Sequence, residues 1–218
     1  MKRDGTVILF DLDGTLIDST EAILESFSAA YGELGDEAPD ADAIVRMIGI
    51  PLGEMFIRLG ADVSSVERYV GAYKKHYRKI SREKTVLLPG AREAVEEAAY
   101  FARLGVVTTK TGRYSIELME YFGLMNHFEV LVGSEDVENH KPHPEPILKA
   151  LDTMGASTSC AWMIGDTLMD VHAAHAAGIM PYALTCGYGS EQELKAECKH
   201  LAPDAKTAVM DIRSESLL

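Results

Sequence analysis

The segment Val7-Ile8-Leu9-Phe10-Asp11-Leu12-Asp13-Gly14-Thr15 places four consecutive apolar residues directly before a cluster of polar ones. An apolar run this short fits a strand covered on both faces of a parallel sheet, although periodicity alone does not separate such a strand from a buried helix. Four more short apolar runs end at a polar residue or at glycine, and they cover residues 105–107, 130–132, 162–164 and 181–184. We therefore expect five buried strands.

Helical patterns lie between these runs. Apolar residues recur at spacings of three and four, or alanine is frequent, over residues 90–103, 114–121, 144–154 and 168–177. Strands that alternate with helices predict an α/β fold, in which a doubly wound parallel sheet carries helices on both faces. We expect the tail after Asp204 to be loosely ordered.

Residues 19–83 interrupt this alternation, because they show helical patterning and no clear strand. A doubly wound fold would normally have one crossover helix between its first two strands, so we interpret this stretch as an inserted all-α cap domain. The turn at residues 88–90 then returns the chain to the core. The predicted organisation is an α/β core made of residues 1–18 and 84–218 with a helical cap made of residues 19–83.

The composition is that of an acidic protein. Lys and Arg number 21 and Asp and Glu number 34, so the formal net charge is 21 − 34 = −13. A chain with so little excess positive charge is poorly suited to a nucleic-acid backbone or an anionic membrane surface, and we expect neither as a partner. The apolar run at residues 7–10 is too short for a signal peptide, and no apolar stretch approaches membrane-spanning length. We predict a cytoplasmic protein.

Four polar clusters stand where ligands of open parallel sheets bind, outside the carboxyl ends of the strands. They are residues 11–15, Thr108-Thr109-Lys110, His140-Lys141-Pro142, and Gly165-Asp166 with Asp170. If the strands lie side by side, these clusters converge on one point.

Up to four carboxylates would meet there, from Asp11, Asp13, Asp166 and Asp170. Unpaired carboxylates repel one another, and a hard divalent cation with oxygen ligands relieves the repulsion. Mg²⁺ suits a site that offers few carboxylates, waters and a substrate phosphate. Lys141 adds a second positive charge, so the cation and this lysine could hold a phosphoryl group while a carboxylate attacks it.

At these positions the sequence resembles the haloacid dehalogenase-like superfamily. Residues 11–16 (DLDGTL) resemble its first motif, Thr108 its second, Lys141 its third, and residues 165–170 (GDTLMD) its fourth. The four motifs occur in the family's order and cover nearly the whole chain. The resemblance implies a Rossmann-like core with a helical cap after the first motif, and a Mg²⁺-dependent phosphatase.

The resemblance also implies roles for single residues. Asp11 would be the nucleophile, and Asp13 would protonate the leaving alkoxide and then activate water. Thr108 and Lys141 would hold the phosphoryl group. The predicted metal ligands are Asp11, Asp13, Asp166 and Asp170, and the further phosphate-binding residues are Gly14, Thr109 and Lys110.

The substrate is less clearly indicated. The turns at residues 88–90 and 187–189 look most like the phosphoglycolate phosphatase and pyrophosphatase branch, which favours a small phosphomonoester such as phosphoglycolate. A pyrophosphatase and a hexose-phosphate mutase remain open, because a mutase keeps all the core motifs. A binding module without activity is disfavoured because the nucleophile, the acid, the lysine and the metal acids are all present. We expect a monomer or a homodimer.

Overall fold

A parallel sheet forms the centre of the computed structural model, which describes residues 5–215. Six strands of the described residues pair in the order β5-β4-β1-β6-β7-β8, all parallel. The strands are β1 Val7–Phe10, β4 Arg103–Val107, β5 Phe128–Val132, β6 Ala161–Gly165, β7 Met180–Leu184 and β8 Leu201–Ala202. The predicted α/β fold with a parallel sheet is confirmed, and each of the five expected strands is present.

Helices cover both faces of this sheet, and the alternation along β1 shows how. Ile8 and Phe10 pack into the cluster that contains the helices at 91–101 and 205–215, whereas Val7 and Leu9 pack into the cluster that contains the helices at 145–154 and 168–177. Successive side chains of a strand point to opposite faces, so a strand covered on both sides is apolar throughout. The helices are α5 Ala91–Phe101, α6 Gly112–Tyr121, α7 Glu145–Met154, α8 Leu168–Ala177, α9 Glu191–Glu197 and α10 Ala205–Glu215.

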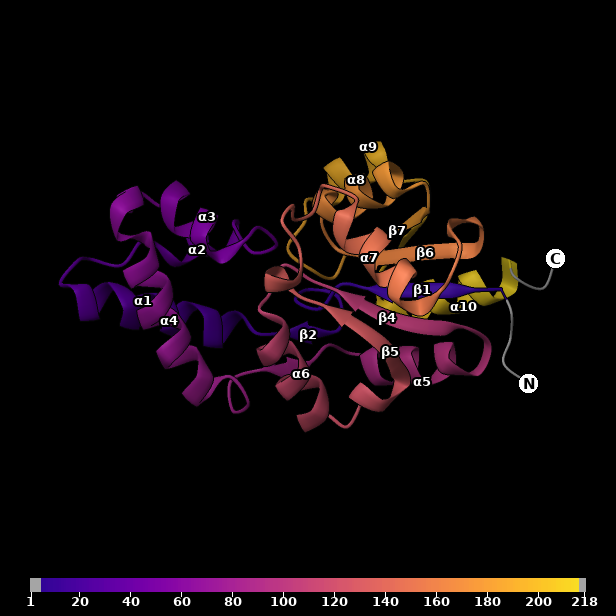
Figure 1. Cartoon of the computed structure of the whole chain (residues 1–218), viewed down its shortest axis with the longest axis horizontal. Coiled ribbons are helices and arrows are strands. Elements are labelled where there is room, and N and C mark those ends of the chain that lie inside the picture. Colours follow the sequence, from indigo (N-terminus) through magenta and orange to yellow (C-terminus); the bar gives the residue numbers. More distant parts are fainter. Residues whose placement is uncertain (1–4, 216–218) are drawn as a thin grey trace.

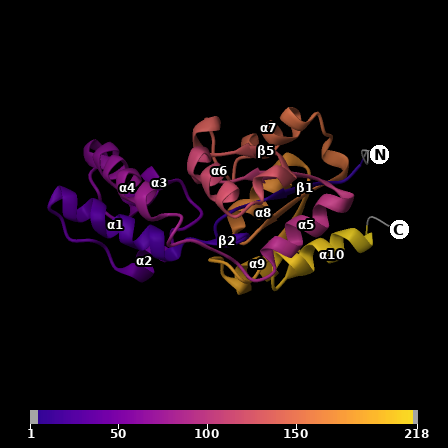
Figure 2. The same ribbon diagram turned by 90° about the horizontal axis from the view of Figure 1, so that it is seen from below.

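The expectation of a loosely ordered tail after Asp204 is wrong for residues 205–215, which form α10. Ala205, Ala208, Val209 and Ile212 lie on one face of this helix, at spacings of three and four, and are buried. They pack with α5, and the two helices lie side by side (Figure 2). Burial of this apolar stripe stabilises the helix.

Residues 20–80 form a separate helical lobe at the other end of the molecule from the chain termini (Figure 1). Its elements are α1 Thr20–Leu34, α2 Ala41–Val45, α3 Leu52–Arg58, the short 3₁₀ helix Val63–Ser65 and α4 Val66–Ile80. The lobe has its own core, in which the rings of Phe27 and Phe56 lie 4.6 Å apart and those of Tyr31 and Tyr69 4.8 Å apart. Aromatic rings bury large apolar areas, and this cluster gives the small lobe a core independent of the sheet.

A two-stranded antiparallel ribbon joins the lobe to the core. β2 (Ile17–Asp18) pairs with β3 (Val86–Leu87), so the chain leaves and re-enters the core at one place. The other short elements are the 3₁₀ turns Met125–His127, Ser134–Asp136 and Thr158–Cys160. No helix among residues 5–215 is long and apolar enough to cross a membrane.

Candidate active site

Three acids meet at the carboxyl edge of the sheet. Asp11 directly follows β1 and Asp166 directly follows β6, the neighbouring strand, while Asp170 lies in the first turn of α8. Each of the three offers a carboxylate oxygen that lies within 4.8 Å of the others, and all three side chains are buried. The topology therefore brings together acids that are 155 positions apart in the chain (166 − 11).

Lys141 lies among these acids and is itself buried. Its Nζ is 2.9 Å from Asp11 Oδ1 and 2.5 Å from Asp170 Oδ1, and it donates a hydrogen bond to the carbonyl of Val107 at 3.0 Å. Burial alone would lower the pKa of Lys141, but the two carboxylates outweigh it and raise that pKa, so the lysine is charged. The ammonium group of Lys141 thus pairs with two buried acids, Asp11 and Asp170.

The acids carry more negative charge than Lys141 neutralises. Burial raises the pKa of Asp11 to about 7 against the opposing charge of Lys141. Burial, followed by the charges of Asp11 and Asp170, raises the pKa of Asp166 well above its usual value. A buried carboxylate with a raised pKa and other acids beside it is the setting that a divalent cation relieves. The donor set, three buried carboxylates, fits a hard cation such as Mg²⁺.

The loop after β1 is built to approach Asp166. Gly14 has a φ of +80°, and a Cβ at this position would overlap the Asp166 carboxylate. Thr15 donates a hydrogen bond to Asp166 Oδ1 at 3.0 Å, and the backbone N–H of Tyr188 donates to Oδ2 at 2.8 Å. Gly187 permits a similarly close approach, since its Cβ would also overlap Asp166. Only glycine tolerates both the positive φ and the close contact at residue 14.

Asp13 is not part of the cluster of three acids and instead lines the chamber below the helical lobe. Its Oδ1 accepts a hydrogen bond from Ser19, and its Oδ2 lies 2.8 Å from Nζ of Lys110. The Lys110 ammonium also lies 4.7 Å from the centre of the Tyr77 ring. Burial would lower the pKa of Lys110, but the charge and hydrogen bond of Asp13 together with Tyr77 and Tyr73 outweigh it and raise that pKa. Lys110 is therefore engaged with Asp13, and its expected contact with phosphate stays a prediction.

The Thr108-Thr109-Lys110 turn follows β4. Thr108 is buried, and its Oγ1 accepts a hydrogen bond from the backbone N–H of Lys110 at 3.2 Å. Thr109 reaches across to the lobe, where its Oγ1 donates to the carbonyl of Gly49 at 3.0 Å. This hydrogen bond joins the core turn to the segment between α2 and α3.

Three residues near the site were not singled out from the sequence: Thr15, Ser19 and Tyr188. The Tyr188 hydroxyl lies 3.0 Å from Thr20 Oγ1 at the start of α1, so one residue contacts both Asp166 and the lobe. Thr15 belongs to the first motif and Ser19 follows it by three residues, but neither was given a role of its own.

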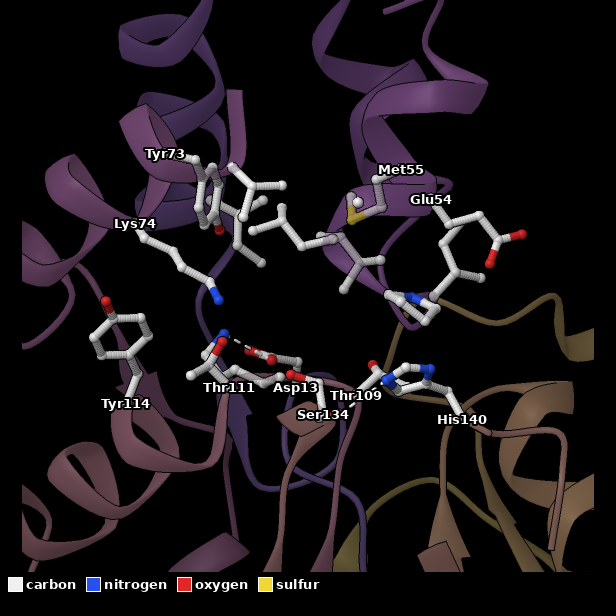
Figure 3. Close-up of a pocket in the computed structure, with 18 of the residues that line it drawn as sticks. Asp13, Glu54, Met55, Tyr73, Lys74, Thr109, Thr111, Tyr114, Ser134 and His140 are labelled. Carbon is white, nitrogen blue, oxygen red and sulfur yellow. Dashed lines mark hydrogen bonds and ion pairs between the residues drawn. The ribbon is translucent and has the colours of Figure 1, made fainter. Parts of the chain in front are cut away.

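A cavity of about 440 Å³ opens above Asp13, between the core and the helical lobe (Figure 3). Asp13, Thr109 and Lys110 form part of its floor, and residues of α3 and α4 form its walls. The site therefore joins an acid cluster in the core to a chamber whose upper part belongs to the lobe.

Comparison with known proteins identifies this arrangement. Residues 8–183 match the family model described as haloacid dehalogenase-like hydrolase. The chain belongs to the haloacid dehalogenase-like hydrolases. The predicted family is thus confirmed.

Relatives within this family carry different activities in their names. The chain is 35% identical over 175 residues to the pyrophosphatase PpaX of Halalkalibacterium halodurans. The aligned region covers 79% of this chain and 80% of that protein. It is 31% identical to the phosphoglycolate phosphatase of Aquifex aeolicus, over 84% of this chain and 85% of that protein. A haloacid dehalogenase-like hydrolase from Bacteroides fragilis has the same fold, with a TM-score of 0.87 at 29% identity, and covers 94% of this chain and 99% of its own. This chain is therefore a phosphatase of the haloacid dehalogenase-like family. Members of this family generally use a divalent metal.

Proposed function

We propose that the protein is a Mg²⁺-dependent phosphatase that hydrolyses a phosphomonoester through an aspartyl-phosphate formed on Asp11. The observation that supports this most strongly is the position of Asp11, whose carboxylate lies 2.9 Å from Lys141 and shares a buried cluster with Asp166 and Asp170. A carboxylate can act as a nucleophile at phosphorus where fixed positive charge offsets the charge of the phosphate.

In the first step, an Asp11 oxygen forms a bond to phosphorus and the bond from phosphorus to the alcohol oxygen breaks. Asp13, in its protonated form, gives its proton to the departing oxygen. Lys141 neutralises part of the negative charge on the transferring group, and the Thr108 hydroxyl donates a hydrogen bond to one of its oxygens. The free alcohol then leaves.

In the second step, Asp13 takes a proton from a water molecule, whose oxygen attacks the phosphorus of the aspartyl-phosphate. The bond from phosphorus to the Asp11 oxygen breaks, and phosphate and the carboxylate are regenerated. Acid–base assistance of this kind accelerates the reaction by about 10²–10⁴-fold. The Asp13 carboxylate contacts the Ser19 hydroxyl and the Lys110 ammonium.

Asp11, Asp166, Asp170 and the backbone carbonyl of Asp13 would hold Mg²⁺ in this proposal. The ion would supply positive charge that draws the substrate phosphate to the acids and offsets their repulsion. Residues 19–83 would act as a cap that closes over the chamber to exclude bulk water and opens to release product. Gly14, Thr109 and Lys110 complete the proposed phosphate-binding loop region.

The test is phosphate release by the Asp11→Asn variant in the presence of Mg²⁺. We expect no measurable turnover, because the amide is a poor nucleophile, while an exposed acid on α7 changed in the same way, Asp152→Asn, leaves turnover unchanged. Free phosphate and alcohol as products also separate hydrolysis from the mutase alternative, which would yield an isomer. Normal turnover in Asp11→Asn would overturn the proposal.

A further inference from the structure

The ammonium group of Lys110 lies between the core and the lobe. On the core side, its Nζ lies 2.8 Å from Asp13 Oδ2 and 3.4 Å from the Ser19 hydroxyl oxygen. On the lobe side, it lies 4.7 Å from the centre of the Tyr77 ring, which belongs to α4. Only 10% of the Lys110 side chain is exposed, so water competes little for this cation. The lysine therefore connects the proposed acid–base group to the lobe.

The Tyr77 ring is fixed in the place where it meets Lys110. Its side chain is buried, and its ring stacks on that of Tyr73 with centroids 5.6 Å apart and an angle of 11° between the planes. Tyr73 points into the chamber from the same helix, and the ring of Tyr114, from α6 of the core, lies 6.0 Å from that of Tyr77 (Figure 3). A cation within about 6 Å of a ring centre is attracted to the ring face, and more strongly where water is excluded. The ring thus attracts and confines the Lys110 ammonium.

The contact with Lys110 uses the ring of Tyr77 and not its hydroxyl. The hydroxyl is buried and has no hydrogen-bond partner among residues 5–215. Tyr31 is also buried in the core of the lobe with an unpartnered hydroxyl, but its ring packs against Phe56 at 5.9 Å, and within the described residues no contact joins it to Lys110. Removal of an unpaired hydroxyl breaks no hydrogen bond. The two tyrosines are therefore matched in burial and differ in their contact with the cation.

Resting on the proposed phosphatase function, we propose that Tyr77 is a positioning residue whose ring holds the Lys110 ammonium against Asp13, so that the Asp13 carboxylate is fixed for proton transfer to the leaving oxygen. Tyr77 itself touches no reacting atom and acts through Lys110. A lysine has a flexible four-carbon stem, so without the ring its ammonium can turn away from Asp13. The carboxylate then loses one of its partners, and a misplaced catalytic group slows the step that depends on it.

Two related esters separate this role from a general loss of activity. Phenyl phosphate and 4-nitrophenyl phosphate share the phosphate and the ring, but nitrophenolate leaves readily without a proton, whereas the more basic phenolate depends on general acid assistance. We expect kcat/KM of Tyr77→Leu to fall about tenfold with phenyl phosphate and less than threefold with 4-nitrophenyl phosphate. Tyr77→Phe keeps the ring face and should keep both values within twofold of the wild type.

Tyr31→Leu is the matched control, because it truncates a buried tyrosine of the same lobe core. It should lower the thermal midpoint about as much as Tyr77→Leu does and leave the ratio of the two kcat/KM values unchanged. An equal loss for both esters in Tyr77→Leu would indicate a structural effect or a lost phosphate contact and would overturn the inference. A Tyr77→Phe protein that behaves like Tyr77→Leu would overturn it as well.

A measurement without substrate separates the contact from the phosphatase function. Limited acetylation, followed by mass spectrometry of the peptide that contains Lys110, reports how freely its ammonium leaves Asp13 and the ring. We expect Lys110 to be acetylated at least threefold faster in Tyr77→Leu than in the wild type or in Tyr77→Phe, with the exposed Lys195 as internal reference. An unchanged rate would overturn the inference whatever the activity. Absence of phosphate release from every ester in the wild type would instead count against the phosphatase proposal.

Discussion

At the scale of single residues, Lys141 holds the site together. It is buried between Asp11 and Asp170, at 2.9 Å and 2.5 Å, and two acids depend on its charge. A buried ion pair contributes little net free energy compared with an apolar replacement of both partners, but the loss of one partner leaves an uncompensated buried charge. The stability of the apo core should therefore be sensitive to this one lysine.

We predict that Lys141→Met lowers the free energy of unfolding by about 3–5 kcal/mol in the absence of metal, and that it also abolishes phosphate release. Urea unfolding monitored by the fluorescence of Trp162, the one tryptophan of the chain, measures the first effect. Lys195→Met provides the control, because Lys195 pairs with Glu191 at the surface with 62% of its side chain exposed, and exposed pairs contribute about 0–1 kcal/mol. A Lys141→Met protein as stable as Lys195→Met would contradict the prediction.

At the scale of elements, the loop between β7 and α9 connects the acid cluster to the lobe. The backbone N–H of Tyr188 donates to Asp166, and the hydroxyl of the same residue lies 3.0 Å from Thr20 Oγ1 at the start of α1. The Tyr188 ring also packs against the hydrophobic core of the lobe. A motion of α1 relative to the core must therefore break or carry the contact of Tyr188 with Thr20.

We predict that Tyr188→Phe changes kcat severalfold and leaves the Mg²⁺ concentration needed for half-maximal activity unchanged. The substitution removes the hydroxyl contact with the lobe but keeps the backbone hydrogen bond to Asp166. Steady-state kinetics with a titration of Mg²⁺ checks both parts. Thr20→Val removes one partner of that hydroxyl and leaves the other, Asp18 Oδ1 at 3.5 Å, so the double variant should behave as Tyr188→Phe does, whereas additive effects would show that the two hydroxyls do not act as a pair.

The sequence predicted elements where the signal is local. The strand at residues 7–10 and the helix at residues 168–177 were found with their observed bounds, because an apolar run stops at an acid in the first and alanine spacing ends at a glycine in the second. The helix at residues 205–215 was missed, although its apolar residues do show helical spacing. The two-residue strands at 17–18, 86–87 and 201–202 are too short to carry a periodic signal.

The residues of the site also divide into those that a local sequence signal could place and those that it could not. Asp11 and Asp166 could be placed at one edge of the sheet because each follows a strand, and the topology of parallel strands brings such ends together. Tyr188 could not, since its partner Thr20 is 168 positions away and belongs to the lobe. The contact of Lys110 with the Tyr77 ring likewise depends on how α4 packs against the core, which no local pattern encodes.

At the scale of the whole molecule, the core and the lobe contribute different parts of one function (Figure 1). All three acids of the cluster belong to the core, whereas the walls of the chamber belong largely to the lobe. A cation bound at the cluster should therefore stabilise the core, and its effect on folding can be measured without any substrate.

We predict that saturating Mg²⁺ raises the thermal midpoint of the core, followed by Trp162 fluorescence, and that a chelator reverses the rise. An ion that binds only the native state adds about 2.7 kcal/mol at a concentration of one hundred times its Kd, which is roughly 5–10 °C for a chain of this size. Asp166→Asn should lose this increment because it removes one of the three carboxylate ligands, while the surface change Asp152→Asn should keep it in full. An equal rise in Asp166→Asn would place the ion elsewhere in the protein, because a cation held by the buried acids cannot be indifferent to the loss of one of their charges.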